Sequence, residues 1–209
     1  GLRWLTLRVD GRMAHAGRAH LGINAAHIMA HIVVELETVF SALPFDDEIL
    51  GHPRFTCGVI RGGVATNVVP PSCEAELDVR IVPPLVPADA VTIVNQVATR
   101  VIARYPGATY AVEALGAARP PVRASDDSVI VRALRESYRR VAGRLPEVGG
   151  ADGHEAYTDS AMIAALTGST SSTVLGPGAT DQAHTADEFV PIADLELGAK
   201  LLWDMVEQW

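Results

Sequence analysis

The segment CEAELDVRIV at residues 73–82 is the most regular pattern in the chain. Apolar residues alternate in it with charged ones: Cys73, Ala75, Leu77, Val79 and Ile81 against Glu74, Glu76, Asp78 and Arg80. Successive side chains of a β-strand point to opposite faces, so a period of two predicts a strand with one face in a core and one in water. The prolines at 83, 84 and 87 end this strand, because proline cannot donate to a sheet ladder.

The segments on either side predict three more strands and two helices. Strands are expected at 2–14, 54–61 and 108–115, and a turn at 15–22. Helices are expected at 24–42 and 88–104, where apolar residues recur at helical spacing. The order β-α-β-β-α-β is the ferredoxin-like split arrangement, in which one sheet layer packs on one helix layer.

The second half of the chain has a different composition. Residues 116–125 (GAARPPVRAS) are a proline-rich joint, which predicts one domain at 1–115 and another at 119–209. Helices are expected at 127–142 with Ser125 as the cap and Gly143 as the end, at 159–167, and after Pro191. With only one short buried strand, at 172–175, this half reads as one end of a larger α/β domain.

Charge and composition exclude some classes of partner. The 209 residues carry 25 acidic and 17 basic side chains, and Lys200 is the only lysine, so nucleic acid is not expected as a partner. No apolar run reaches the roughly 18 residues that a membrane span needs. We expect Cys57 and Cys73 to be buried thiols and the protein to be cytoplasmic. The sequence opens inside a predicted strand and without Met, so we expect a preceding segment.

His184 lies in the stretch GPGATDQAHTADE at 176–188, where a tight turn precedes a lone imidazole. One interpretation is a loop histidine paired with Asp181, Asp187 or Glu188. The other is a metal-binding imidazole that an acid orients from behind. The glycines of the turn favour the second interpretation, because they let backbone approach a ligand closely.

Three further residues have both an ordinary and a functional interpretation. Asn67, in GGVATNVVPP at 62–71, is either a turn residue or an amide donor to a substrate oxygen. Arg80 either pairs with Asp78 or Glu76, or holds a substrate carboxylate with its planar fork. His15, with His20 nearby, either caps a turn or donates to a developing oxyanion.

Two other groups of polar residues also have an ordinary and a functional interpretation. His27, His31 and Glu35 are spaced for one face of a helix, which we interpret as a solvated face rather than a metal face. Asp152 and Asp159 flank a glycine-rich loop, where Thr158 or Asp159 caps a helix or the helix N-terminus attracts an anion. A small hydrolase based on His154 or Asp159 ranks last, because no nucleophile pattern accompanies them.

Taken in order, five segments resemble a known family. They are HAGRAHLGINA (15–25), GGVATNVVPP (62–71), LDVR (77–80), YTDSA (157–161) and GPGATDQAHTADEFV (176–190). The chain resembles the zinc-dependent amidohydrolases and exopeptidases, the family of acetylornithine deacetylase, succinyl-diaminopimelate desuccinylase, aminoacylase and glutamate carboxypeptidase. The resemblance implies that 1–115 is a lid and homodimerisation domain. It also implies that 119–209 is the C-terminal part of an α/β catalytic domain that binds two ions of zinc, or of cobalt or manganese.

The resemblance also implies roles for single residues. His184 matches the last zinc ligand, and His15 matches a lid histidine that reaches the tetrahedral intermediate, often from the partner subunit. Arg80 matches the residue that holds the substrate carboxylate. The substrate also contacts the positions of Asn67, Gly176, Pro177 and Gly178.

The family's H-x-D motif and adjacent glutamates do not occur in this sequence. One histidine cannot hold zinc alone, so we expect little bound zinc and no activity from these residues by themselves. For the intact protein we expect hydrolysis of an amide in an N-acyl amino acid or a small peptide with a free carboxylate. The alternative is a non-catalytic dimerisation or peptide-binding module that pairs through a sheet edge.

Overall fold

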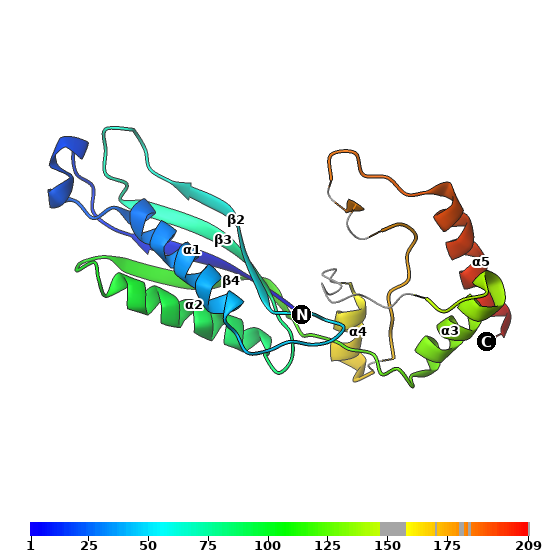
Figure 1. Ribbon diagram of the computed structural model, residues 1–209. Helices are drawn as coiled ribbons and strands as arrows, with labels where there is room; N and C mark the ends of the chain where they lie inside the picture. The colour runs from blue at the N-terminus through cyan, green and yellow to red at the C-terminus, as the bar shows by residue number, and fades with distance from the viewer. Residues whose placement is uncertain (147–157, 170, 180–181, 184, 209) are drawn as a thin grey trace. The chain divides into compact units, whose positions relative to one another are not determined.

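The computed structural model describes residues 1–146, 158–169, 171–179, 182–183 and 185–208. It consists of two compact units, one of Gly1–Asp47 and Gly51–Pro121, the other of Glu48–Leu50 and Val122–Trp209 (Figure 1). Several residues discussed above lie outside the described residues: the loop at 149–153 with Asp152, and His154, Asp181 and His184.

The first unit contains a four-stranded antiparallel sheet and two helices. The strands are β1 (Leu2–Asp10), β2 (Arg54–Gly62), β3 (Ser72–Arg80) and β4 (Thr109–Arg119). The helices are α1 (Ala25–Ser41) and α2 (Pro87–Ile102). The sheet order is β2-β3-β1-β4 and every neighbouring pair is antiparallel, which confirms the ferredoxin-like β-α-β-β-α-β arrangement.

The core of this unit lies between the sheet and the two helices, which cover the same face (Figure 1). The apolar half of the β3 alternation faces it: Leu77 pairs with Leu5 of β1, and Ala75 with Leu7. From α1 the core receives Ile28, Met29, Ile32, Leu36 and Phe40, and from α2 Val94, Val97 and Val101. Each large side chain buried in this way contributes roughly 1.5–3 kcal/mol. The face without helices, which we call the outer face, carries the charged half of the alternation.

Helix α1 is fixed at its start and in its middle. The side chain of Asn24 accepts hydrogen bonds from the N–H groups of Ala26 and His27, both at 3.1 Å, as a helix cap does. Glu35 is bound by Arg100 of α2 and by Arg104, whose Nη2 lies 2.9 Å from Oε2. Glu35 therefore joins the two helices.

Several boundaries differ from the sequence prediction. Residues 16–21 form a short 3₁₀ helix, η1 (Ala16–Leu21), where only a turn was expected. Strand β4 continues to Arg119, which pairs with Leu2 of β1, so the joint begins later than residue 116. The strand expected at 172–175 is wrong, because the described residues 171–179 form no strand.

The second unit contains α3 (Val129–Ala142), α4 (Ser160–Thr167) and α5 (Ile192–Gln208). Ser128 caps α3 by accepting from Val131, so the prediction of Ser125 as the cap is wrong; Ser125 instead accepts from the N–H of Asp127. Gly143 ends α3 as predicted, with a φ of 68°. None of the described helices is long and apolar enough to cross a membrane.

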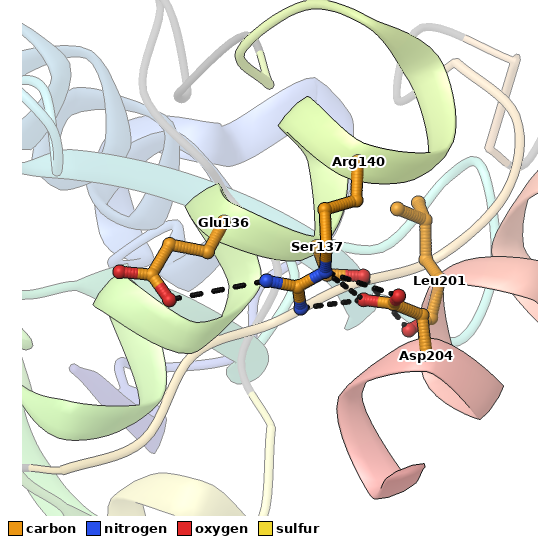
Figure 2. A network of polar contacts seen from close by, with 5 residues as sticks. All are labelled: Glu136, Ser137, Arg140, Leu201 and Asp204. Atoms are coloured by element: carbon orange, nitrogen blue, oxygen red, sulfur yellow. Dashed lines mark hydrogen bonds and ion pairs between the residues drawn. The ribbon is translucent and has the colours of Figure 1, made fainter. Parts of the chain in front are cut away.

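Polar contacts join α3 to α5 (Figure 2). The hydroxyl of Ser137, which is fully buried, donates to the carbonyl oxygen of Leu201 at 3.1 Å. Arg140 donates to both carboxylate oxygens of Asp204, and its shortest contact is 2.6 Å. These contacts, with Leu201 buried between the helices, define the register of the pair.

Candidate functional site

His15 is held at the N-terminus of η1 by one ring nitrogen. Its Nδ1 accepts a hydrogen bond from the backbone N–H of Gly17 at 3.0 Å. In the neutral ring the proton therefore sits on Nε2, which makes Nε2 the donor. His15 is exposed and caps the turn through Nδ1, which is the ordinary interpretation from the sequence; its role as a donor to an oxyanion stays a prediction.

The structure brings His15 and Asn67 together. The two segments run antiparallel beyond the end of the sheet, and His15 pairs with Val68. The backbone N–H of Ala16 donates to the carbonyl oxygen of Asn67 at 2.9 Å, and that of Val69 to Ala14 at 2.8 Å. Asn67 itself is exposed, so its amide and the imidazole of His15 belong to one tip of the first unit.

Arg80 lies at the other end of the sheet. Its Nε donates to Oδ1 of Asp78 at 2.7 Å, and its Nη2 donates to Oδ2 at 3.1 Å. Oδ2 of Asp78 also accepts from the indole N–H of Trp4 at 3.0 Å, and the guanidinium of Arg119 stacks 4.8 Å above the ring of Trp4. The ion pair with Asp78, which the sequence offered as the ordinary interpretation, is therefore present.

His15 and Arg80 of one copy are far apart. Arg80 pairs with Leu2, whereas Ser72, at the other end of β3, pairs with Asp10, which precedes the His15 tip. The eight residue steps from Ser72 to Arg80 span about 26 Å at the rise of a β-strand. A small substrate cannot contact both residues of the same copy.

The segment Gly176–Gly178 of the second unit bends at Pro177 and Gly178. Gly178 has a φ of 86°, which favours glycine, and an added Cβ would lie 3.3 Å from Val190 Cγ2. Gly176 and Pro177 are exposed beside it. Asp159 is also exposed and occupies the N-cap position of α4, but its side chain accepts no hydrogen bond there.

No three potential metal ligands come together anywhere in the described part of the chain. His184, the one residue proposed as a ligand, lies outside that part. The described residues alone thus do not fit a two-metal centre.

The pKa shifts distinguish two unreactive thiols from two carboxylates that form ion pairs. Burial raises the pKa of the thiols of Cys57 and Cys73, so neither has thiolate character at neutral pH. Hydrogen bonding to Arg100 lowers the pKa of Glu35, and hydrogen bonding to Arg140 lowers that of Asp204. Both carboxylates are therefore held in structural ion pairs, Glu35 with Arg100 and Asp204 with Arg140.

Residues 1–106 match the family described as the peptidase dimerisation domain, M20_dimer. The chain belongs to the M20 peptidase family. The family expected from the sequence is thereby confirmed, and the first unit contains the dimerisation domain of this family.

Curated relatives match almost the whole chain. Acetylornithine deacetylase from Proteus mirabilis is 27% identical over 207 residues, which are 97% of this chain and 50% of that protein. The chain spans about half the length of the curated relatives it matches.

Solved structures share the fold at lower identity. An amidase of the hydantoinase/carbamoylase family from Burkholderia vietnamiensis has a TM-score of 0.76 at 21% identity, over 99% of this chain and 47% of that one. An M20 family metallo-carboxypeptidase from Sulfolobus solfataricus has a TM-score of 0.69 at 19% identity, over 99% of this chain and 58% of that one.

The sequence pattern proposes His15, Asn67 and Arg80 as site residues but does not indicate the surroundings of Arg80. Trp4 comes from β1, which lies beside β3, and Arg119 comes from β4, which lies beside β1; both adjacencies exist only after the sheet forms. The strand pairing was the missing signal, because the register that aligns Leu2 with both Arg80 and Arg119 follows from it.

Proposed function

We propose that this chain supplies the lid and the C-terminal part of the catalytic domain of a metal-dependent hydrolase. The enzyme cleaves an amide bond in an N-acyl amino acid or a small peptide with a free carboxylate. The observation that carries the proposal is M20 membership over residues 1–106, together with similarity to acetylornithine deacetylases over 97% of the chain. The free thiols of Cys57 and Cys73 favour a reducing compartment such as the cytoplasm.

In this proposal His15 stabilises the negative charge that develops on the scissile carbonyl oxygen. Its Nδ1 is occupied by Gly17, so the ring is oriented and Nε2–H is the donor. Loss of one such donor typically lowers the rate about 10²–10³-fold. Asn67, on the segment paired with His15, supplies its side-chain amide as a second donor to the same substrate.

Arg80 holds the free carboxylate of the substrate with its planar fork. Asp78 occupies that fork in the structure, but a partly exposed ion pair contributes only about 0–1 kcal/mol. A substrate carboxylate can therefore replace Asp78 without a large loss of stability, while Asp78 keeps the guanidinium oriented beforehand.

The separation of His15 from Arg80 supports a homodimer. If both act on one small substrate, His15 must come from one subunit and Arg80 from the other. The edge strand β2 and helix α1 carry exposed apolar side chains, Ile60 (54% exposed) and Val34 (62% exposed), which support this edge as the lid interface.

An exposed apolar stripe on α5 supports the proposal that the second unit is one part of a larger domain. One side of α5 packs on α3 through Leu201, and another stripe at helical spacing is exposed. That stripe consists of Ile192, Leu195, Leu202, Trp203 and Val206, each at least half exposed. A helix with two apolar faces packs between two neighbours, so a further layer of the catalytic domain would cover this one.

For the intact enzyme we propose two zinc ions, or cobalt or manganese in their place, with His184 as one ligand and Gly176–Gly178 lining the substrate site. This chain alone would bind little zinc and would be inactive, because the other ligands and the general base would come from elsewhere in the protein.

The test is metal analysis and amide hydrolysis with the purified 209-residue chain and with the intact protein that carries it. We expect metal and turnover of N-acyl amino acids in the intact protein, and neither in the chain. An intact protein that binds no metal and hydrolyses no N-acyl amino acid would overturn the proposal and favour the alternative, a dimerisation or peptide-binding module. Stoichiometric zinc in the chain would overturn its proposed dependence on outside ligands.

A further inference from the structure

A small hairpin at 46–52 connects the end of α1 to the start of β2. Asp47 and Gly51 exchange two backbone hydrogen bonds in it, of 3.0 Å from the N–H of Asp47 and 2.8 Å from the N–H of Gly51. The next pair outward in this antiparallel register is Asp46 with His52. The hairpin therefore places a carboxylate opposite an imidazole at the position where its two arms separate.

Both ring nitrogens of His52 face acceptors. Nε2 lies 2.9 Å from the carbonyl oxygen of Phe40, and Nδ1 lies 3.4 Å from Oδ1 of Asp46. A carbonyl oxygen and a carboxylate oxygen only accept, so each contact needs a proton on the nitrogen. A neutral imidazole has one N–H and can make only one of the two contacts, whereas the imidazolium donates to both.

The carbonyl group of Phe40 suits a cationic donor. Phe40 is in the last turn of α1, which ends at Ser41, and the last carbonyl groups of a helix carry its negative end charge. The ring of Phe40 also stacks on that of Phe55 in β2, with centroids 5.7 Å apart. A charged His52 thus joins the hairpin to the end of α1, where α1 already contacts β2.

No second charged side chain contacts the ring in the described part of the chain, where Asp46 is the only one that pairs with His52. The adjoining segments of α1, the hairpin and β2 carry four other charged residues: Glu37, Asp47, Glu48 and Arg54. The side chain of His52 is 29% exposed and that of Asp46 is 82% exposed. Solvent therefore reaches the pair, and its charge state can follow the pH.

We propose that His52 is a pH-dependent clamp, whose protonated ring joins the 46–52 hairpin to the C-terminus of α1 and whose neutral ring releases one of the two contacts. Histidine ordinarily changes its charge between about pH 5 and pH 8, and carboxylates are ordinarily charged throughout that range. The clamp therefore closes in weakly acidic solution and opens as the pH rises and the ring loses its proton. This inference goes beyond the proposed hydrolase function and does not depend on it.

Hydrogen exchange of the amides of Asp47 and Gly51 in the intact protein tests this inference. It is measured at about pH 5.5 and about pH 7.5, and each rate is corrected for the intrinsic pH dependence of amide exchange. We expect about twofold to fivefold greater protection at the lower pH, which is the range that a solvent-exposed ion pair provides. The two amides report on the clamp because they lie directly inside the pair of Asp46 and His52.

His52→Gln should abolish the pH dependence, because glutamine does not titrate. Asp46→Asn should reduce it, because the protonated ring then loses its charged acceptor. Glu37→Gln is the matched control: it removes a charge from the same end of α1 that does not contact the ring, and it should keep the full dependence. Thermal melting checks folding, and Asp46→Asn, which changes an exposed side chain, serves if His52→Gln fails to fold.

Equal corrected protection at both pH values in the wild type would overturn the inference, and so would a difference that survives in His52→Gln or is unchanged in Asp46→Asn. Loss of the pH dependence in Glu37→Gln would attribute it to the overall charge of the region and would also overturn the clamp. None of these results bears on the proposed hydrolase function, which metal content and turnover of the intact protein test.

Discussion

Asp78 holds the guanidinium of Arg80 through two hydrogen bonds, of 2.7 and 3.1 Å, from a position two residues earlier on the same strand. Residues i and i+2 share a face of a strand, so this pair needs no other element to form. The carboxylate fixes the direction of the guanidinium, and in the proposed function the substrate carboxylate replaces it. Arg80 is thus both structurally paired and suited to a ligand.

Replacing Arg80 with lysine keeps the charge and removes the fork. For the intact enzyme, we expect Arg80→Lys to raise the KM for carboxylate-bearing substrates about tenfold or more, with a smaller effect on kcat. Steady-state kinetics measures this, and Arg61→Lys is the control on the same face. If Arg80→Lys leaves KM unchanged, Arg80 does not bind the substrate.

His15→Asn separates the two functions of the imidazole. Asparagine at an N-cap accepts from the backbone as Nδ1 does, so the turn at Gly17 should remain, but the Nε2 donor is lost. We expect kcat of the intact enzyme to fall about 10²–10³-fold while KM changes little. His20→Asn, in the same 3₁₀ helix, should keep full activity. A variant with normal kcat would exclude His15 from the chemistry.

Subunit mixing tests whether His15 and Arg80 act from different copies. We expect the separate His15→Asn and Arg80→Gln enzymes to be nearly inactive, and a mixture of the two to recover activity. A mixed dimer forms one site with both defects and one site with neither. After statistical exchange about half of the dimers are mixed, so the recovered activity should approach about one quarter of the wild-type value. No recovery despite demonstrated exchange would place both residues in the site of one subunit.

Glu35→Gln tests the connection between α1 and α2. Hydrogen bonding to Arg100 lowers the pKa of Glu35, so its contribution to stability is present above the ordinary carboxyl pKa of about 4 and is lost as the pH falls through the lower folded value. Because the site is partly exposed, we expect a loss of about 0.5–1 kcal/mol at pH 7. Denaturant unfolding measures it, with Glu37→Gln as the control. A deficit that persists at pH 2 would contradict the ion-pair explanation.

Asp204→Asn tests the α3–α5 connection in the second unit. Its pKa is lowered by hydrogen bonding to Arg140, so the stabilisation is again present above about pH 4 and lost below it. Wild type should melt at a higher temperature than Asp204→Asn at pH 7, and the difference should vanish as the pH falls below the folded pKa. Glu207→Gln on the same helix should melt like wild type throughout. Equal melting temperatures of Asp204→Asn and wild type at pH 7 would show that the pair contributes nothing.

The fold of the first unit followed from the sequence because its signals are local. The alternation at 73–82 fixed a half-buried strand, and Asn24 marked the start of α1 as a cap. Ser125 and Ser128 both fit a cap by composition, and only the path of the chain decides between them. Gly116 suggested a joint, but β4 continues past it because pairing with β1 outweighs the low strand propensity of glycine.

The site was predictable only residue by residue. His15 and Asn67 stood out as polar residues in glycine-rich segments, but their proximity depends on the pairing of 14–16 with 67–69. The expected strand at 172–175 failed because Val174 and Leu175 are too few apolar residues to specify an element. The contacts of Trp4 with Asp78 and Arg119 depend on strand register, which composition does not contain.

The pairing of Leu2 with Arg119 has a consequence for how such proteins evolve and can be engineered. The backbone enters and leaves the ferredoxin-like unit through adjacent strands, so the whole unit is a cassette that a host loop can accept without stretching. Grafting residues 2–119 into a loop of an unrelated monomer would transfer its pairing surface as a single module.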